Sequence, residues 1–404
     1  MSSRPRCILA FSGGLDTSLC VVYLREELGY DVITATVDTG GFDAEELKHI
    51  ETRSRELGAL EHITIDATAE LFQDWIRHII AANYLKGGVY PLCVGVERVV
   101  QAQHMIEIAR QKNATAICHG STGAGNDQIR FDVVIQTHAP ELKIIAPIRD
   151  LGWGRQQEAD YLAKFGFEVD ASTKRYSINA GLWGTTIGGG ETKTSDGIVP
   201  PHVYPSSKKY GAAPAEHRDI TISFEKGVPV ALDGERLDAI PLLRKLDDIA
   251  AAYGVGRGLH LGDTIIGIKG RIAFEAPAAL TIIDAHRELE KIILTKWQAF
   301  VKDQVADFYG LFLHEGKYLD PAMRDIEALL DSSQRAVTGD ATVRLQEGRH
   351  QVIATTSPHS MLDATRAAYG EESGLWNGRD AEGFAKIQSI QSMLAFRAGE
   401  GKHS

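Results

Sequence analysis

The first 170 residues alternate short apolar runs, rich in β-branched residues, with longer stretches whose apolar residues recur every three or four positions. The runs predict buried strands, and the longer stretches predict amphipathic helices. The predicted strands are 7–11, 31–38, 62–66, 116–119 and 143–147, and the predicted helices are 16–28, 43–58, 68–85 and 96–112. This alternation indicates βαβ units, and hence an α/β domain whose doubly wound parallel sheet is covered on both faces. A ligand is then expected beyond the carboxyl ends of the strands.

The amino-acid composition changes over 176–210, where Gly, Pro, Ser and Thr dominate. Such composition predicts loop and domain connection rather than regular structure. Because compact domains seldom contain loops of this length without a function, the segment is expected to lie near the active site.

The second half predicts an α+β domain. Its features are a hairpin over 220–232 around Lys226-Gly227, a helix at 238–253, an apolar run at 264–270, helical stretches at 278–309 and 321–331, and a hairpin over 341–356. A last helix over 381–397 places Phe384, Ile387, Ile390 and Leu394 on one face, which must pack on its own domain or on another subunit. The predicted division is 1–170, 171–380 and a C-terminal helical segment 381–404.

The composition is that of an ordinary globular protein, with 44% hydrophobic and 24% charged residues in a chain of 404. A net charge of −11 argues against broad nucleic-acid binding. No apolar run approaches the ~18 residues of a membrane-spanning helix, and the N-terminus lacks a signal-peptide pattern, so a cytoplasmic location is expected. The four scattered cysteines form no CxxC pair and no HExxH motif occurs, so no protein-held metal is predicted.

The segment 7–18 reads CILAFSGGLDTS, an apolar strand that runs into Ser12-Gly13-Gly14 and then into a helix. The glycines allow a sharp turn close to a phosphate, and the free N–H groups of the new helix face the anion. Ser12, Thr17 and Ser18 add hydroxyl donors. A Walker loop would carry a lysine for the β- and γ-phosphates, and this loop has none. The loop therefore suits a pyrophosphate that is held and released.

A second loop, 119–132, reads HGSTGAGNDQIRFD and also follows a predicted strand. Its glycines allow close approach to a ligand. Five residues supply hydrogen-bond donors and acceptors within a few positions: Thr122, Asn126, Asp127, Gln128 and Arg130. This density beside three glycines is unusual for a plain surface loop, and it predicts a second binding segment.

The first loop resembles that of the PP-loop ATP pyrophosphatases, and the two loops together closely resemble argininosuccinate synthase. The likeness extends to KIIAPIRD at 143–150, the YSI and LWG segments at 176–184, and IIGIKGR at 265–271. It implies a PP-loop (HUP-like) domain followed by a synthetase and multimerisation domain. It also implies a homotetramer, with the C-terminal helix reaching a neighbouring subunit.

The resemblance implies a two-step ligation. The ureido oxygen of citrulline attacks the α-phosphate of ATP, with Mg²⁺ carried by the nucleotide, and the amine of L-aspartate then displaces AMP. By motif position, the residues implied in ATP binding are Ala10, Phe11, Ser12, Gly13, Gly14, Leu15, Asp16, Thr17, Ser18, Val37 and Gly120. Aspartate would be bound by Thr122, Asn126 and Asp127. The acceptor would be bound by Tyr90, Asn126, Arg130, Ser177 and Thr186.

Four positions around the acceptor depart from the family pattern. Gly95 and Thr186 each stand where the family has a serine, Gly262 where it has a glutamate, and Phe274 where it has a tyrosine. The missing glutamate matters most, because it grips the amino end of citrulline in the family; Asp263, next to it, is a possible substitute. Two interpretations remain: an argininosuccinate synthase with rearranged citrulline contacts, or a paralogue that joins aspartate to another ureido, amide or carboxylate acceptor.

Two other classes compete less well. A tRNA-modifying PP-loop enzyme also adenylates a carbonyl oxygen, but it would need a basic surface and often catalytic cysteines. A nucleotide-binding sensor would not need the second loop. Release of AMP and pyrophosphate that depends on two small substrates would separate an enzyme from a sensor.

Overall fold

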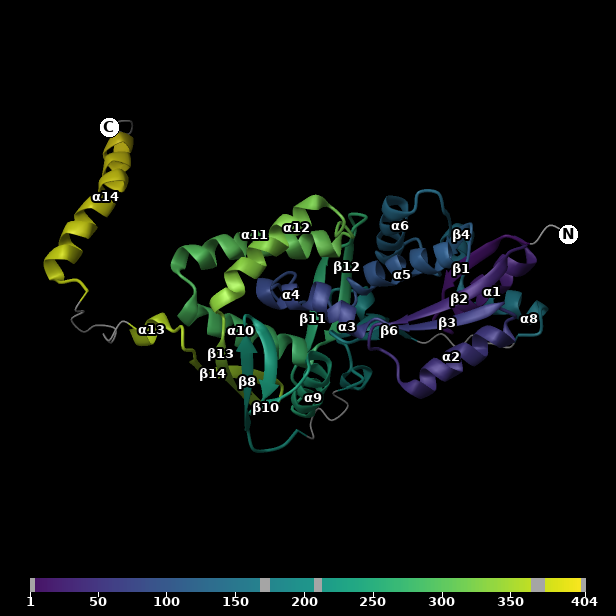
Figure 1. Cartoon of the computed structure of the whole chain (residues 1–404), viewed down its shortest axis with the longest axis horizontal. Coiled ribbons are helices and arrows are strands. Elements are labelled where there is room, and N and C mark those ends of the chain that lie inside the picture. The colour runs from purple at the N-terminus through teal and green to yellow at the C-terminus, as the bar shows by residue number, and fades with distance from the viewer. Residues whose placement is uncertain (1–3, 168–174, 207–212, 365–374, 401–404) are drawn as a thin grey trace. The chain divides into compact units, whose positions relative to one another are not determined.

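The computed structural model describes residues 4–167, 175–206, 213–364 and 375–400. Many of its helices and strands are labelled in Figure 1. Two compact units contain them, one spanning 1–357 and the other 358–404.

The first sheet is a five-stranded parallel sheet in the order β3-β2-β1-β4-β5. Its strands are β1 Arg6–Ala10, β2 Asp31–Asp38, β3 Glu61–Asp66, β4 Ala116–Cys118 and β5 Lys143–Ile145. The chain moves outward from β1 to β3 and then crosses to the other side for β4 and β5. The order therefore reverses between β1 and β4, the place where open α/β sheets bind ligands. The predicted doubly wound parallel sheet is confirmed.

Alternate residues of β1 divide the core between the two faces of this sheet. Cys7 and Leu9 pack with α1 (Leu15–Glu26) and α8 (Arg155–Lys164), whereas Ile8 joins the core on the side of α5 (Glu97–Gln111). Because successive strand residues point to opposite faces, a continuous apolar run is what a strand covered on both faces requires. The other helices of this region are α2 Ala44–Glu56, α6 Asp127–His138 and α7 Pro147–Leu151.

The predicted helix over 68–85 is one continuous helical run as far as Ala82, with a π-helical turn inside it. It consists of α3 Thr68–Leu71, a π-helical turn η1 Phe72–Ile76 and α4 Arg77–Ala82, and it ends at Asn83, whose φ is 50°. Three helices of this region, α6, α7 and α8, were not predicted. In α6 the first turn lies inside the predicted loop, since the helix starts at Asp127 directly after Gly125 and Asn126.

The segment 176–210 was wrongly predicted to be loop alone, because its first part is a hairpin. β6 Tyr176–Gly181 and β7 Gly184–Gly189 belong to a four-stranded antiparallel sheet in the order β11-β12-β7-β6, with β11 Arg257–Asp263 and β12 Lys269–Glu275. Pairing across the sheet overrode the weak strand propensity of a glycine-rich sequence. Two 3₁₀ turns follow, η2 Gly190–Lys193 and η3 Pro201–Val203. Residues 264–268 of the apolar run form the turn from β11 to β12, and its last two residues begin β12.

A third sheet contains both predicted hairpins, in the order β10-β9-β8-β13-β14. Its strands are β8 Arg218–Glu225, β9 Val228–Leu232, β10 Glu235–Arg236, β13 Gly339–Gln346 and β14 Arg349–Thr356. All its pairs are antiparallel. The helices α9 Ala239–Ala252 and α10 Pro277–Ile293 pack on it.

The predicted helical stretch 278–309 is two helices rather than one. α10 ends at Ile293, and α11 (Lys296–His314) starts after Thr295, whose side chain accepts from the backbone N–H of Gln298 in a capping box. The apolar periodicity continues across this boundary, so the sequence pattern did not reveal the capping box. α12 Pro321–Ser333 and η4 Gln334–Ala336 follow.

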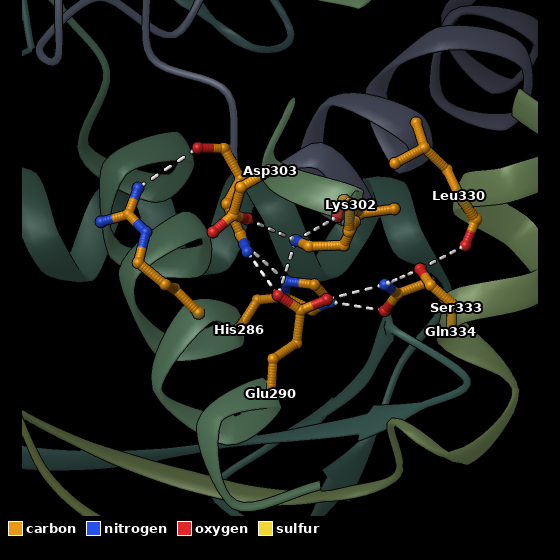
Figure 2. A network of polar contacts seen from close by, with 10 residues as sticks. His286, Glu290, Lys302, Asp303, Leu330, Ser333 and Gln334 are labelled. Carbon is orange, nitrogen blue, oxygen red and sulfur yellow. Dashed lines mark hydrogen bonds and ion pairs between the residues drawn. The ribbon is translucent and has the colours of Figure 1, made fainter. Parts of the chain in front are cut away.

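A buried polar network joins α10, α11 and η4 to the end of α4 (Figure 2). Lys302 Nζ lies 2.7 Å from Glu290 Oε2 and donates to the Ala81 carbonyl at 2.9 Å. The Lys302 and Glu290 side chains are 1% and 6% exposed. Asn83 and Gln334 donate to the two oxygens of the same carboxylate. A charge this deeply buried needs such partners, so the network fixes the positions of these helices.

The second unit contains α13 Met361–Ala364 and α14 Gly378–Glu400. The predicted helix over 381–397 lies inside α14. Its apolar stripe (Phe384, Ile387, Ile390 and Leu394) is 44–70% exposed. None of the helices among the described residues is both long and apolar enough to cross a membrane.

Candidate active site

The phosphate loop lies at the carboxyl end of β1, where the sheet order reverses. Gly13 has a φ of 74°, in the region that favours glycine, and Gly14 is the extended residue before α1. The Thr17 hydroxyl donates to the Gly14 carbonyl at 3.3 Å and accepts from the Ser12 N–H at 3.4 Å. The buried Ser18 hydroxyl has no hydrogen-bond partner among the described residues. The turn therefore presents a helix N-terminus with several hydroxyl groups, which suits a phosphate.

The other residues implied in ATP binding lie on the neighbouring strands. Gly120 follows β4, and a Cβ at this position would lie 3.0 Å from the Thr17 side chain, so the two loops touch. Val37 is buried near the carboxyl end of β2, on the other side of β1. The Thr36 hydroxyl donates to the Phe11 carbonyl at 2.7 Å and ties β2 to the loop.

Asp127 is held between two arginines at the start of α6. Its Oδ2 accepts from Arg98 Nε and its Oδ1 from Arg130 Nη1, both at 2.9 Å. Burial alone would raise the pKa of Asp127, but Arg98 and Arg130 outweigh it and hold the pKa below its ordinary value. The side chain is still 36% exposed. Because each carboxylate oxygen can accept more than one hydrogen bond, Asp127 keeps capacity for a further donor.

Arg130 is buried and uses most of its donors inside the protein. Nε and Nη2 donate to the His314 carbonyl at 3.0 and 2.8 Å, and Nη2 also lies 3.3 Å from His314 Nδ1. A bidentate clasp on a substrate carboxylate would therefore require the guanidinium to release His314. Gly95 packs against it, since a Cβ there would lie 3.4 Å from Arg130 Nη2, in van der Waals contact.

One face of the sheet β11-β12-β7-β6 gathers the remaining residues predicted for the acceptor. Phe274 pairs directly with Thr186, and paired residues share a face. The alternation along each strand places Ser177 and Gly262 on this same face. Asn179 and His260, which no sequence pattern indicated, lie there too.

The N-terminal region meets this face through Tyr90 and Asn126. The Tyr90 ring stacks on His260, with centroids 5.6 Å apart, and is 5.2 Å from Phe274. Asn126 Oδ1 accepts from the backbone N–H of Ile265 at 2.9 Å. The structure thus brings the predicted acceptor residues Tyr90, Asn126, Arg130 and Phe274 together with the β11–β12 hairpin.

Glu97 is a buried carboxyl group beside this site that the sequence analysis missed. It is 2% exposed, and its Oε1 has no hydrogen-bond partner among the described residues. Burial raises the pKa of Glu97 to about 8, against the opposing effect of Arg98. A Cβ on Gly181 would lie 1.7 Å from Oε1, so a larger residue there would require the Glu97 carboxyl group to move. The sequence does hint at this buried carboxyl group, because Glu97 and Arg98 form a charged pair inside the apolar run CVGVERVV.

Two family models cover the chain. The N-terminal HUP domain of arginosuccinate synthase matches residues 6–168, and the C-terminal domain of the same enzyme matches residues 176–395. Together they account for most of the chain, including both loops and the acceptor face.

The chain belongs to the argininosuccinate synthase family. Members of this family are ATP-using, AMP-forming C–N ligases. The predicted family and fold class are confirmed.

Relatives from several organisms support this membership. The chain is 41% identical to the argininosuccinate synthase of Xanthomonas campestris over 404 aligned positions, which cover 98% of each protein. It is 38% identical to that of Methanocaldococcus jannaschii, with 96% of this chain and 97% of the relative covered. The enzyme of Pyrococcus furiosus is 37% identical, with 99% and 96% covered.

Proposed function

We propose that the protein joins the amine of L-aspartate to citrulline or a citrulline-like ureido acceptor, with conversion of ATP to AMP and pyrophosphate. The observation that carries this proposal is the contact between two loops. The phosphate loop around Gly13 and the loop that bears Asp127 meet at the switch point of the parallel sheet, where a Cβ on Gly120 would lie 3.0 Å from the Thr17 side chain. Two ligands bound by these loops would lie next to each other.

In the first proposed step, the acceptor's carbonyl oxygen attacks the α-phosphorus and the bond to pyrophosphate breaks. The turn from Ala10 to Ser18 and Gly120 would hold the nucleotide, with Val37 near the adenine. The N–H groups at the start of α1 stabilise the negative charge that develops on the phosphates. Mg²⁺ would arrive bound to the phosphates of ATP. The ion would neutralise charge on the leaving pyrophosphate.

In the second step, the aspartate amine attacks the activated carbon, the bond from carbon to the AMP oxygen breaks, and the amine releases a proton. Thr122, Asn126 and Asp127 would position aspartate, with the Asp127 carboxylate facing its ammonium group before attack. Arg98 keeps Asp127 ionised, as this role requires. Most of the rate gain would come from positioning the amine beside the adenylate.

The acceptor site would be lined by Tyr90, Asn126, Arg130, Ser177 and Thr186. Gly95, Gly262 and Phe274 would stand in the same site, at positions where the residue differs from the family pattern. We also propose a cytoplasmic homotetramer and the division into 1–170, 171–380 and 381–404. The exposed apolar stripe on α14 supports a subunit contact, since stripes of this kind are normally covered.

The test is release of AMP and pyrophosphate from ATP in the presence of aspartate and a panel of ureido acids. Equal amounts of both products, formed only when aspartate and an acceptor are present, are expected. Release of ADP and phosphate would contradict the proposal. A second candidate is the same reaction on an acceptor other than citrulline. It is favoured by Gly262, where a Cβ would lie 2.7 Å from the His260 ring.

A further inference from the structure

The loop that leads to Asp127 is anchored by side chains that lie behind it. Its middle, 122–124, is exposed and belongs to no helix or strand. Behind it lie His119, directly after β4, and Asp132, on α6. The His119 side chain is 1% exposed, and its ring stacks on Phe131 with the two centroids 5.3 Å apart. The two proposed reaction steps give neither His119 nor Asp132 a role.

His119 contacts the backbone of this loop directly. Its Nδ1 accepts from the backbone N–H of Ser121 at 3.3 Å, and its Nε2 lies 3.0 Å from Asp132 Oδ1. A ring nitrogen that accepts from an N–H carries no proton itself, so the ring is neutral and holds its proton on Nε2. Nε2 therefore donates to Asp132. Between the two residues lies Gly120, where a Cβ would be 3.0 Å from the side chain of Thr17.

Asp132 determines which nitrogen of His119 carries the proton. Its Oδ1 accepts from His119, and its Oδ2 accepts from Arg149 Nη1 at 2.7 Å. Burial alone would raise the pKa of Asp132, but the hydrogen bonds from these two partners outweigh it and hold the pKa below its ordinary value. Because an ionised carboxylate can only accept, it requires the proton on Nε2 and leaves Nδ1 to accept from the loop.

Arg149 holds the other side of the same loop. It lies on α7, and its Nη1 also donates to Gln128 Oε1 at 3.4 Å. The Gln128 amide donates in turn to the Gly123 carbonyl. The Ser121 N–H and the Gly123 carbonyl lie on either side of Thr122, which would help to position aspartate. One connected set of side chains therefore fixes the backbone around this residue.

We infer that His119 is a positioning residue for the aspartate-binding loop, acting through its hydrogen bond to the Ser121 N–H, and that Asp132 sets the imidazole tautomer that this bond needs. The inference rests on the proposed function in one respect, that the loop binds aspartate. His119 is too deeply buried to meet a substrate, so it acts through the loop backbone. The phosphate loop has its own internal hydrogen bonds through Thr17, so the affinity for ATP should change little.

Two substitutions separate the contact with Ser121 from the packing of the ring. Nδ1 of histidine and the amide oxygen of asparagine are both two bonds from Cβ, so His119→Asn can still accept from the Ser121 N–H. Nε2 of histidine and the amide nitrogen of glutamine are both three bonds from Cβ, so His119→Gln keeps a donor to Asp132 and loses the acceptor for Ser121. Both variants lose the stack on Phe131, so a role in packing alone would affect them equally.

Aspartate binding is measured by titration calorimetry with the full-length protein and a non-hydrolysable ATP analogue. The Kd for aspartate is expected to rise at least 10-fold in His119→Gln and less than 3-fold in His119→Asn. The Kd for the ATP analogue should stay within 3-fold of the parent in both. Equal losses of aspartate affinity in the two variants, equal losses of aspartate and nucleotide affinity, or a parent that binds no aspartate would overturn the inference.

Turnover is measured separately, as AMP formed from ATP, aspartate and citrulline. AMP formation by the parent together with equal aspartate affinities in His119→Gln and His119→Asn would leave the ligase proposal standing and overturn the inference. The expected difference in aspartate affinity without any AMP formation would do the reverse.

Asp132→Asn tests the role given to the carboxylate. An amide cannot accept from both His119 and Arg149, because only its oxygen accepts. If its nitrogen faces His119, the ring must move its proton to Nδ1 and the bond to Ser121 is lost; if it faces Arg149, two donors oppose each other. The Kd for aspartate is expected to rise at least 5-fold, and an unchanged Kd would overturn the role of Asp132. Asp150→Asn is the matched control and should change nothing, because Asp150 also accepts from Arg149, at 3.1 Å, but its side chain is 62% exposed.

Discussion

Glu97 gives a prediction whose size follows from the structure. It is a 2% exposed carboxyl group whose pKa is raised from 4.5 to about 8, mainly by burial. In the unfolded chain its pKa returns to the ordinary value. Between these two pH values the folded protein therefore holds a proton that the unfolded chain has lost.

The sign of the pH dependence follows. Below pH 4.5 the group is neutral in both states and costs nothing. As the pH rises towards 8, the unfolded state gains stability by ionising, at about 1.4 kcal/mol per pH unit. The cost of Glu97 is then about 3 kcal/mol at pH 7 and approaches about 5 kcal/mol above pH 8.

Glu97→Gln should remove this cost, because the amide is neutral at every pH and similar in size. The free energy of unfolding, measured in urea from pH 5 to 8.5, is expected to be about 3 kcal/mol higher for the variant than for the parent at pH 7. The difference should shrink steadily towards pH 5. Glu107→Gln is the control, since Glu107 lies on the same helix with a side chain that is 64% exposed. A difference between Glu97→Gln and the parent that stays constant across this range would refute the reasoning.

Three further predictions concern the loops and the core. Asp127→Ala should abolish aspartate-dependent AMP formation and leave ATP affinity in a binding titration nearly unchanged; equal losses of both would remove Asp127 from the aspartate site. Gly13→Ala should weaken ATP binding at least 10-fold, because φ is 74° and the new Cβ would lie 3.2 Å from Ile50; unchanged affinity would contradict the proposed loop. Lys302→Met should lower the free energy of unfolding by about 3–5 kcal/mol, because it leaves Glu290 charged and buried. Adding Glu290→Gln should recover part of this loss, and a double variant less stable than the single one would argue against the network in Figure 2.

The parallel sheet could be predicted because its signal is local. Each strand from β1 to β5 is a short apolar run. The residues expected to bind phosphate, such as Gly13 with its positive φ, lie directly after a strand. Position along the chain was enough to place these residues at one edge of the sheet.

The acceptor face could not be predicted in the same way. β6 and β7 are rich in glycine and threonine, and they became strands only because β12 pairs with β7 and β7 pairs with β6. His260 and Asn179 joined the site through register across this sheet, which no local pattern encodes. The contact of His260 with Tyr90 joins residues 170 positions apart, and the burial of Glu97 depends on the close approach of Gly181.

The most direct test of the central claim is the product ratio of one turnover. The purified protein is mixed with ATP, aspartate and citrulline whose ureido oxygen is labelled with ¹⁸O, and AMP and pyrophosphate are measured by mass spectrometry. We predict one AMP for each pyrophosphate, with the label transferred into AMP and no AMP released when aspartate or the acceptor is omitted. Unlabelled AMP, or ADP in place of AMP, would contradict attack of the acceptor oxygen on the α-phosphorus.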